Sequence, residues 1–300
     1  MKVATDGGPR SCTYSVRVRW LVTGAAGMLG SDVVDVLTAR GETVTTTDRR
    51  SLDVTDADAV ERAVSGHDVI VNCAAWTAVD DAEAREPEAF ATNALAAGYV
   101  ARAARIHGAT LVHVSTDYVV DGTAGHPIPE DAVPRPLSAY GRTKLAGEWA
   151  VRAEAPGRHL ILRTAWLYGA GGPCFPKTIL RVARERGALS VVDDQVGQPT
   201  WTHDVATQAV QAVLDGVPSG TYHATSAGQA SWYEFARAVV EAGGLDPDIV
   251  SPSTSGTLDR AARRPAWSVL DHAASTSAGL APIADWRERW QQASAAVLAV

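Results

Sequence analysis

The sequence predicts an α/β protein with a doubly wound parallel sheet and a smaller C-terminal lobe. Three observations lead to this fold class. Short β-branched and apolar runs alternate with longer amphipathic runs through the first half of the chain. A glycine-rich turn follows the first apolar run, and the alternation becomes finer-grained in the second half. Alternation of this kind is typical of βαβ units, whose strands run parallel and whose helices cover both faces of the sheet.

The first half of the chain contains the clearest alternation. Its β-branched runs predict strands, and the amphipathic runs between them predict helices, the first over residues 28–39. Thr55 and Asp58 resemble a capping box, which predicts a helix that starts there and runs to Val64. The predicted strands are residues 18–23, 43–47, 68–72, 110–115 and 159–164.

The second half has shorter segments after a glycine-rich loop at 169–173. Residues 17–168 are expected to form one domain, and residues 169–300 mainly a lobe over the strand ends, with segments that cross back. The predicted helices of this half are residues 176–186, 203–215, 232–241 and 285–298, and its predicted strands are 189–192 and 220–223.

Composition excludes several classes of protein. The 300 residues are 46% hydrophobic and 20% charged, as in an ordinary globular protein, and the net charge is −7. That charge argues against binding to nucleic acid or to an anionic membrane surface, and no apolar run is long enough to span a bilayer.

The cysteines and the N-terminal segment indicate the cellular compartment of the protein. Cys12, Cys73 and Cys174 are scattered without metal-binding spacing, which favours the cytoplasm and argues against a zinc site. Residues 1–16 are polar and lack the apolar stretch of a signal peptide, so we expect a disordered extension there.

The glycine turn is the first candidate functional site. Gly24, Gly27 and Gly30 recur at every third position between the first predicted strand and the first predicted helix. Glycine permits a tight turn and close approach of the backbone to a pyrophosphate, and a helix N-terminus favours negative charge. A plain strand–turn–helix has the same spacing, but the flanking elements favour a Rossmann-type dinucleotide site that includes Met28 and Leu29.

Further cofactor candidates follow other predicted strands, because ligands of such sheets bind beyond the carboxyl ends of the strands. Asp48 ends the second strand, where an acidic residue binds the adenosine ribose hydroxyls. Asp53 and Val54 follow closely and are placed to meet the adenine. Ala74 and Ala75 follow the third strand, where small side chains leave room for a dinucleotide.

The residues conflict on the choice of dinucleotide. A carboxylate at position 48 favours NADH and repels a 2′-phosphate. Arg49 and Arg50 come next, and a guanidinium binds phosphate through paired, charge-assisted hydrogen bonds. Both cofactors therefore stay open on the residues alone.

Tyr140 and Lys144 are the candidate catalytic pair. Their spacing places them on one face of a helix. Because a neutral tyrosine has a pKa near ~10, we expect the lysine ammonium to favour the phenolate and lower that pKa. Thr116 ends the fourth strand, where its hydroxyl is placed to hydrogen-bond a substrate carbonyl beside the phenol.

Taken together, the motifs resemble the extended short-chain dehydrogenases/reductases, and more narrowly the dTDP-4-dehydrorhamnose reductase family. The likeness runs from residue 17 to residue 290 and rests on collinear segments. These are LVTGAAGMLG (21–30), NCAAWTAVD (72–80), HVSTDYV (113–119), AYGRTKLAGE (139–148), RTAWLYG (163–169), DDQVGQPT (193–200) and RPAWS (264–268).

The resemblance implies roles for particular positions. Thr116, Tyr140 and Lys144 would form the catalytic set, with Tyr140 and Lys144 also contacting the cofactor, and Asn93 would lie near that cofactor. The implied substrate-binding residues are Thr116, Asp117, Trp166, Thr200, Trp201 and Arg264, the last as a candidate for the diphosphate.

Three departures from the family pattern are visible, and the N-terminal extension is one of them. Val120 stands where relatives usually carry Phe, which is expected to enlarge a wall near the cofactor or substrate. Some members use C-terminal carboxylates for a metal-bridged dimer, but Asp285 and Glu288 offer no clear three-ligand set, so we expect no metal. The resemblance still allows a homodimer.

The implied reaction is reduction of the 4-keto group of a dTDP-6-deoxy-4-ketohexose, in rhamnose supply or in an antibiotic pathway. NADPH is the expected reductant, with NADH as the alternative. The related 4,6-dehydratases carry an Asp-Glu pair after the catalytic Thr, whereas Asp117 is followed here by Tyr118. An epimerase and a non-catalytic, cofactor-binding regulatory subunit remain as alternatives.

Overall fold

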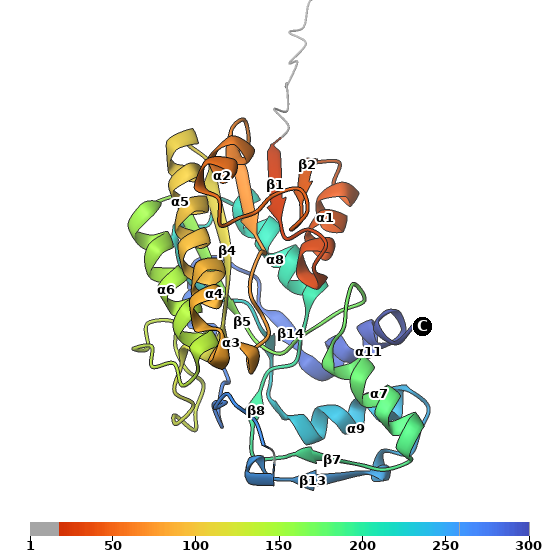
Figure 1. Ribbon diagram of the computed structural model, residues 1–300. Helices are drawn as coiled ribbons and strands as arrows, with labels where there is room; N and C mark the ends of the chain where they lie inside the picture. The colour runs from red at the N-terminus through yellow and green to blue at the C-terminus, as the bar shows by residue number, and fades with distance from the viewer. Residues whose placement is uncertain (1–17, 258, 300) are drawn as a thin grey trace, which may run out of the picture.

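The computed structural model describes residues 18–257 and 259–299. The expected disordered extension, residues 1–16, lies outside these residues. Two bodies are visible in Figure 1: a sheet flanked by helices, and a smaller lobe built around α7, α9 and α11 below and to one side of it.

The larger body is built on one six-stranded sheet with the order β10-β5-β4-β3-β1-β2. All five strand pairs in it are parallel. The order changes direction around β1, so the crevice beyond β1 and β3 is a topological switch point, where ligands of open α/β sheets bind. The strands are β1 (Arg19–Thr23), β2 (Thr43–Thr47), β3 (Val69–Asn72), β4 (Thr110–Thr116), β5 (His159–Thr164) and β10 (Gly220–His223).

Helices cover both faces of this sheet because its strands are apolar on both sides. Along β1, Trp20 and Val22 pack into one core with α1 and α8, while Leu21 packs into the opposite core with α2, α5 and α6. Successive side chains of a strand point to opposite faces, so a run without polar interruptions fills both layers. The helices are α1 (Met28–Ala39), α8 (Thr202–Leu214), α2 (Ala57–Val64), α5 (Ala96–His107) and α6 (Ala139–Glu154).

The segment between β3 and α5 is irregular. It forms the short helices α3 (Asp81–Ala84) and α4 (Glu86–Phe90), followed by a π-helical turn, η1 (Ala91–Leu95). This turn runs directly into α5 and packs against α6. A π-helical turn inside a helix is frequent at functional sites.

The smaller lobe has a separate apolar core in which Tyr168, Phe235, Trp286 and Trp290 pack together. Its helices are α7 (Phe175–Arg186), α9 (Trp232–Ala242) and α11 (Trp286–Leu298), whereas the short α10 (Ala273–Ser277) packs against β10 of the larger body. Its two-stranded sheets pair β7 (Leu189–Val192) with β13 (Val250–Ser253), β6 (Leu167–Tyr168) with β9 (Thr200–Trp201), β8 (Val196–Gly197) with β12 (Ala230–Ser231), and β11 (Ser226–Ala227) with β14 (Ile283–Asp285). Three 3₁₀ turns, η2 (Asp117–Val119), η3 (Pro247–Ile249) and η4 (Ser255–Thr257), complete the assignment.

The predicted fold class is confirmed: the sheet is parallel and doubly wound. Between the lobe segments, the chain returns to the larger body at α8 and β10, and β10 pairs with β5. One local prediction is wrong. The N-cap of α2 is Asp56, whose carboxylate accepts from the amides of Asp58 and Ala59, whereas the Thr55 hydroxyl donates to Asp53.

Candidate active site

A cavity of about 1180 Å³ opens at the carboxyl ends of the sheet strands and reaches the lobe. Strand-end residues from β1, β2, β3, β4 and β5 line it, together with α6 and the N-terminus of α9. Most of the predicted site residues line this one cavity. They are Gly24, Gly27, Met28, Leu29, Gly30, Asp48, Arg49, Asp53, Val54, Ala74, Ala75, Thr116, Asp117, Tyr140, Lys144 and Trp166.

The glycine turn packs tightly against the segment after β3. Gly24 has a φ of +68°, in the left-handed region, and a Cβ at this position would lie 2.8 Å from the amide nitrogen of Ala74. Any larger residue would therefore push the turn away from β3. Gly27 precedes α1, whose first turn contains no acidic residue and receives no side-chain cap. The free amide groups there suit the pyrophosphate of a dinucleotide.

The loop after β2 places a negatively and a positively charged side chain, Asp48 and Arg49, at the cavity. The Oδ1 of Asp48 accepts from the amides of Arg50 and Ser51 at 2.9 and 3.0 Å. These hydrogen bonds, with the Ser51 hydroxyl, hold the pKa of Asp48 below its usual value. Arg49 lines the cavity beside Asp48, whereas Arg50 is not among the lining residues. Arg49 is thus the guanidinium available to a ligand in this cavity.

Asn93 lies one layer behind the cavity wall. Its side chain is 1% exposed and bonds both backbone groups of Trp76, accepting from the amide at 2.8 Å and donating to the carbonyl at 3.1 Å. It also donates to the Thr143 hydroxyl at 3.0 Å. Asn93 therefore anchors the Ala74–Trp76 wall to α6, and its neighbours Ala91 and Thr92 line the cavity instead.

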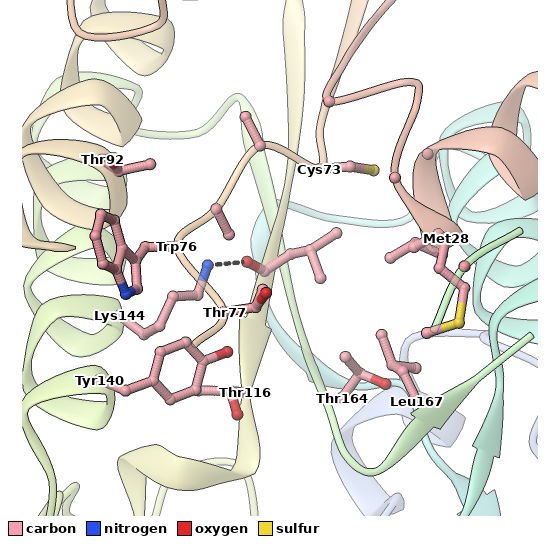
Figure 2. Close-up of a pocket in the computed structure, with 18 of the residues that line it drawn as sticks. Met28, Cys73, Trp76, Thr77, Thr92, Thr116, Tyr140, Lys144, Thr164 and Leu167 are labelled. Atoms are coloured by element: carbon pink, nitrogen blue, oxygen red, sulfur yellow. Dashed lines mark hydrogen bonds between the residues drawn. The ribbon is translucent and has the colours of Figure 1, made fainter. Parts of the chain in front are cut away.

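Thr116, Tyr140 and Lys144 converge on one part of the cavity (Figure 2). Tyr140 and Lys144 extend from α6 toward the end of β4, which supplies Thr116. The Lys144 Nζ donates to the carbonyl oxygen of Val114 at 2.6 Å. Tyr118 packs edge-to-face on Tyr140, with ring centroids 5.4 Å apart. The predicted catalytic residues are thus neighbours in space.

The expected effect of Lys144 on Tyr140 is wrong. Burial raises the pKa of Tyr140 above its ordinary value instead of lowering it, and Asp117 raises it further. The ammonium of Lys144 is directed to the Val114 carbonyl, and burial lowers the pKa of Lys144 to about 8. Tyr140 is therefore a neutral phenol over the physiological range, which is the form that can donate a proton.

A buried ionic cluster holds α6 against the sheet beside these residues. The Glu148 carboxylate is 0% exposed and accepts from Arg163 through two hydrogen bonds of 2.9 Å. It also accepts from Arg152 at 2.8 Å and from the Ser115 hydroxyl at 2.7 Å. Because Ser115 precedes Thr116 and Glu148 lies one turn after Lys144, this cluster sets the position of the predicted catalytic residues on both elements.

Trp166 forms the wall where the lobe meets the cavity. It is the one non-glycine residue with a positive φ, 46°, in the part of the chain that the structure describes. Its indole stacks on Trp232 with centroids 3.5 Å apart and ring planes at 5°. Gly197 also lies against this indole, and a Cβ at that position would collide with the ring. Backbone strain of this kind persists only where surrounding contacts enforce it, commonly at ligand sites.

Three predicted substrate residues do not line this cavity. Thr200 is fully buried, and its hydroxyl donates to the Gln198 carbonyl and accepts from the Ser226 amide. Trp201 packs against Arg289, whose guanidinium lies 5.5 Å from the ring centroid. Their positions reflect packing between β9 and its neighbours in the lobe.

Arg264 is already paired. It donates two hydrogen bonds to the Asp80 carboxylate, at 3.1 and 2.8 Å, and Arg260 adds a third at 3.1 Å. Arg264 therefore holds the pKa of Asp80 well below its usual range. A diphosphate at Arg264 would have to compete with this carboxylate.

Val120 does not enlarge the cavity as expected. Its side chain is buried in a small apolar cluster with Val119, Ile128 and Leu270 and does not line the cavity. Sequence reasoning missed Phe175 and Trp232, which bring the lobe to the cavity wall. Their position next to the starts of two predicted helices was the available signal. Aromatic residues that only pack in the core occur at the same positions, so this signal did not single them out.

Within residues 18–257 and 259–299, no helix is long and apolar enough to cross a membrane. No group of three or more His, Cys, Asp or Glu side chains in those ranges could hold a metal ion. Asp285 instead caps α11, accepting from the amide of Arg287 at 2.9 Å.

Comparison with known proteins gives consistent matches over nearly the whole chain. The dTDP-4-dehydrorhamnose reductase of Streptomyces griseus is 47% identical over 277 residues, covering 90% of this chain and 91% of that protein. The dTDP-4-keto-6-deoxy-D-glucose reductase of Streptomyces niveus is also 47% identical over 277 residues, covering 92% and 96%.

Solved structures agree. A dTDP-4-dehydrorhamnose reductase from Clostridium acetobutylicum matches with a TM-score of 0.88 at 39% identity, covering 92% of this chain and 98% of that one. The Bacillus anthracis enzyme, solved in complex with NADP, matches with a TM-score of 0.87 at 33% identity and the same coverage.

The family model described as "RmlD substrate binding domain" matches residues 18–298. The family resemblance predicted from the motifs is thereby confirmed. The chain belongs to the RmlD substrate-binding-domain family.

Proposed function

We propose that this protein is an oxidoreductase that reduces the 4-keto group of a dTDP-6-deoxy-4-ketohexose with NADPH. The observation that carries the proposal is the convergence of Thr116, Tyr140 and Lys144 on the cavity that also contains the glycine turn. Relatives with 47% identity are named as reductases of such sugars, and a structural neighbour was solved with NADP. Reduction of dTDP-4-dehydro-L-rhamnose to dTDP-L-rhamnose, or of a related antibiotic sugar, fits these names.

The residues of the cavity fit a dinucleotide. Gly24 lets the turn pack closely against the segment after β3, and the N-terminus of α1 is free to receive a pyrophosphate. Asp48 and Arg49 line the end of the cavity that we assign to the adenosine ribose. When bound, NADPH supplies the hydride for the carbonyl carbon. We assign the lobe wall, with Trp166 at its centre, to the sugar nucleotide.

The protein residues then handle the proton and the developing charge. Tyr140, held neutral by burial, donates its phenolic proton to the carbonyl oxygen. Thr116 donates a hydrogen bond to the same oxygen and so stabilises the charge that develops on it. The Lys144 ammonium, in the same part of the cavity, stabilises the phenolate that Tyr140 leaves.

The test is transfer of a labelled hydride. Purified protein, NADPH carrying deuterium at the transferable position, and a dTDP-4-keto-6-deoxyhexose should yield oxidised cofactor and a 4-hydroxy sugar with deuterium at C4. Binding of NADPH without transfer, combined with an effect on a partner enzyme, would favour the regulatory-subunit alternative. Deuterium-free inversion at a sugar carbon would favour an epimerase.

Cofactor choice is expected to depend on Arg49. We predict use of both cofactors with an NADPH preference below about tenfold in kcat/KM, which is under about 1.4 kcal/mol. Arg49→Ala should remove or reverse this preference, because the remaining Asp48 carboxylate repels a 2′-phosphate. Arg50→Ala is the matched control and should change little, since Arg50 does not line the cavity. A strong NADH preference that neither substitution alters would show that Asp48 dominates.

We extend the proposal to a cytoplasmic homodimer. Cys73 and Cys174 are free thiols, which suits a reducing compartment. Phe90, Leu95 and Trp149 expose 41%, 47% and 59% of their surface on elements that pack together, namely α4, η1 and α6. Exposed apolar surface of this kind is typical of interfaces.

Light scattering of the wild-type protein should give twice the mass of one chain. Trp149→Glu should reduce the measured mass to that of one chain, whereas Val133→Glu, on an exposed loop, should leave it unchanged. A monomeric wild-type protein would contradict the dimer.

A further inference from the structure

Asp117 is a buried carboxylate in the wall of the active-site cavity that the mechanism above does not use. It is 2% exposed, yet it lies between two cavity residues, Thr116 and Tyr118. The Thr116 hydroxyl donates to its Oδ1 at 3.0 Å. Its Oδ2 is shielded from solvent and has no hydrogen-bond partner among the residues that the structure describes. A buried, half-satisfied carboxylate at a catalytic position requires an explanation.

The hydrogen bonds of Thr116 show a conflict with the proposed reaction. A threonine hydroxyl has one hydrogen to donate and two lone pairs to accept with. In the structure its hydrogen goes to Asp117, and it accepts from the Tyr118 amide at 3.2 Å. The Tyr140 phenol, kept neutral by burial, lines the same part of the cavity. While Asp117 is ionised, Thr116 therefore has no hydrogen left for a substrate carbonyl.

We propose that Asp117 is a positioning residue whose protonated form turns Thr116 into a hydrogen-bond donor toward the substrate carbonyl. The carboxylic acid then donates its own hydrogen to Thr116 Oγ1, and the Thr116 hydrogen is released to the ketone oxygen. The Tyr118 amide and Asp117 fill both lone pairs of Thr116, so Tyr140 is also free to donate to the same oxygen. This inference rests on the proposed function and specifies how its active site is set for reduction.

The surroundings of Asp117 favour the required protonated form. Burial raises the pKa of Asp117 to about 6, against the opposing effect of its polar neighbours Ser268 and Thr116. The groups that face it are the phenols of Tyr118 and Tyr140, both with raised pKa values and therefore neutral. Beyond Tyr118 lies the paired Arg264–Asp80 bridge, and the Lys144 ammonium lines the same cavity. An anionic sugar nucleotide would favour the neutral acid further.

The test is the pH dependence of kcat/KM for the ketosugar in the wild type and in Asp117→Asn. An asparagine amide can donate to Thr116 as the acid does, but it cannot ionise. In the wild type, kcat/KM should fall about tenfold per pH unit above the pKa of Asp117. The Asn variant should keep the low-pH value and lose this decline, while a separate limb from Lys144, near its pKa of about 8, should remain in both.

Asp121→Asn is the matched control. Asp121 accepts from the Thr123 amide and hydroxyl in a similar local turn but does not line the cavity. This variant should keep the wild-type profile. An Asp117→Asn variant with an unchanged decline, or one that is inactive at every pH, would overturn the inference. Absence of hydride transfer by the wild type would instead refute the proposed function.

Thermal unfolding supplies a readout that does not need activity. Because the folded-state pKa of Asp117 is raised, its contribution to stability is full at low pH and is lost as the pH rises through about 6. The Asp117→Asn variant cannot ionise at this position and does not lose this contribution. The melting temperature of the variant minus that of the wild type should therefore be larger above the pKa of Asp117 than below it. A difference that is the same on both sides would show that Asp117 does not titrate there.

Discussion

Tyr140→Phe should lower kcat by about 10²–10⁴-fold while leaving dinucleotide affinity unchanged, since general acid catalysis contributes on this scale. The hydroxyl is the proposed proton donor, and the ring still fills its place against Tyr118. Steady-state turnover with the ketosugar measures the loss, and titration of NADPH by fluorescence measures binding.

The matched control for this substitution is Tyr118→Phe. Tyr118 lines the same cavity and its pKa is also raised by burial, to about 12, but the mechanism assigns it no proton transfer. Its loss of turnover should be much smaller than that of Tyr140→Phe. Equal losses in the two variants would mean that packing of the tyrosine pair, and not a proton from Tyr140, limits the reaction.

Arg163→Met should destabilise the protein by about 3–5 kcal/mol, because it removes the fully buried partner of a buried ion pair. The Glu148 carboxylate then keeps only the partly exposed Arg152 and the Ser115 hydroxyl. Arg163 is 2% exposed, and a methionine side chain cannot form its two hydrogen bonds to Glu148. The methionine fills most of the volume, so loss of packing is a minor part of the effect. Urea unfolding followed by circular dichroism measures the free energy of unfolding.

Arg152→Met is the control for this second prediction. Arg152 bonds the same carboxylate, but its side chain is 35% exposed, so its loss should cost less than about 1 kcal/mol. The Arg163 pair lowers the pKa of Glu148, so its contribution is present at neutral pH and is lost as the pH falls through the folded-state pKa. The difference between Arg163→Met and wild type should therefore shrink in acid. A similar decrease in the free energy of unfolding for both variants would show that the Glu148 carboxylate is not shielded from water.

Much of the fold could be predicted from local patterns. The β2, β5, β7 and β10 strands and the α1 helix begin and end at the predicted residues, because short β-branched or apolar runs indicate strands and longer amphipathic runs indicate helices. The N-cap residue of a helix is harder to predict, because Asp and Thr are both favoured at that position. At α2 the cap is Asp56, because the Thr55 hydroxyl is already bonded to Asp53.

The candidate site could be predicted where function depends on backbone geometry or on strand ends. Gly24, Asp48 and Thr116 follow from the rule that parallel strands present their carboxyl ends to one crevice, and Tyr140 follows from its helical spacing with Lys144. All of them line the cavity. What the sequence by itself determined was therefore the parallel sheet, the glycine turn and the set of residues at its carboxyl edge.

Only the tertiary structure decided which long-range partners meet. Asp80 reaches Arg264, and Trp166 stacks on Trp232, although these residues are far apart in the chain. Such pairings depend on how the lobe packs against the sheet, and no local periodicity encodes that packing. The pKa of Tyr140 was decided in the same way: burial by its neighbours raises it, and burial is a property of the folded chain.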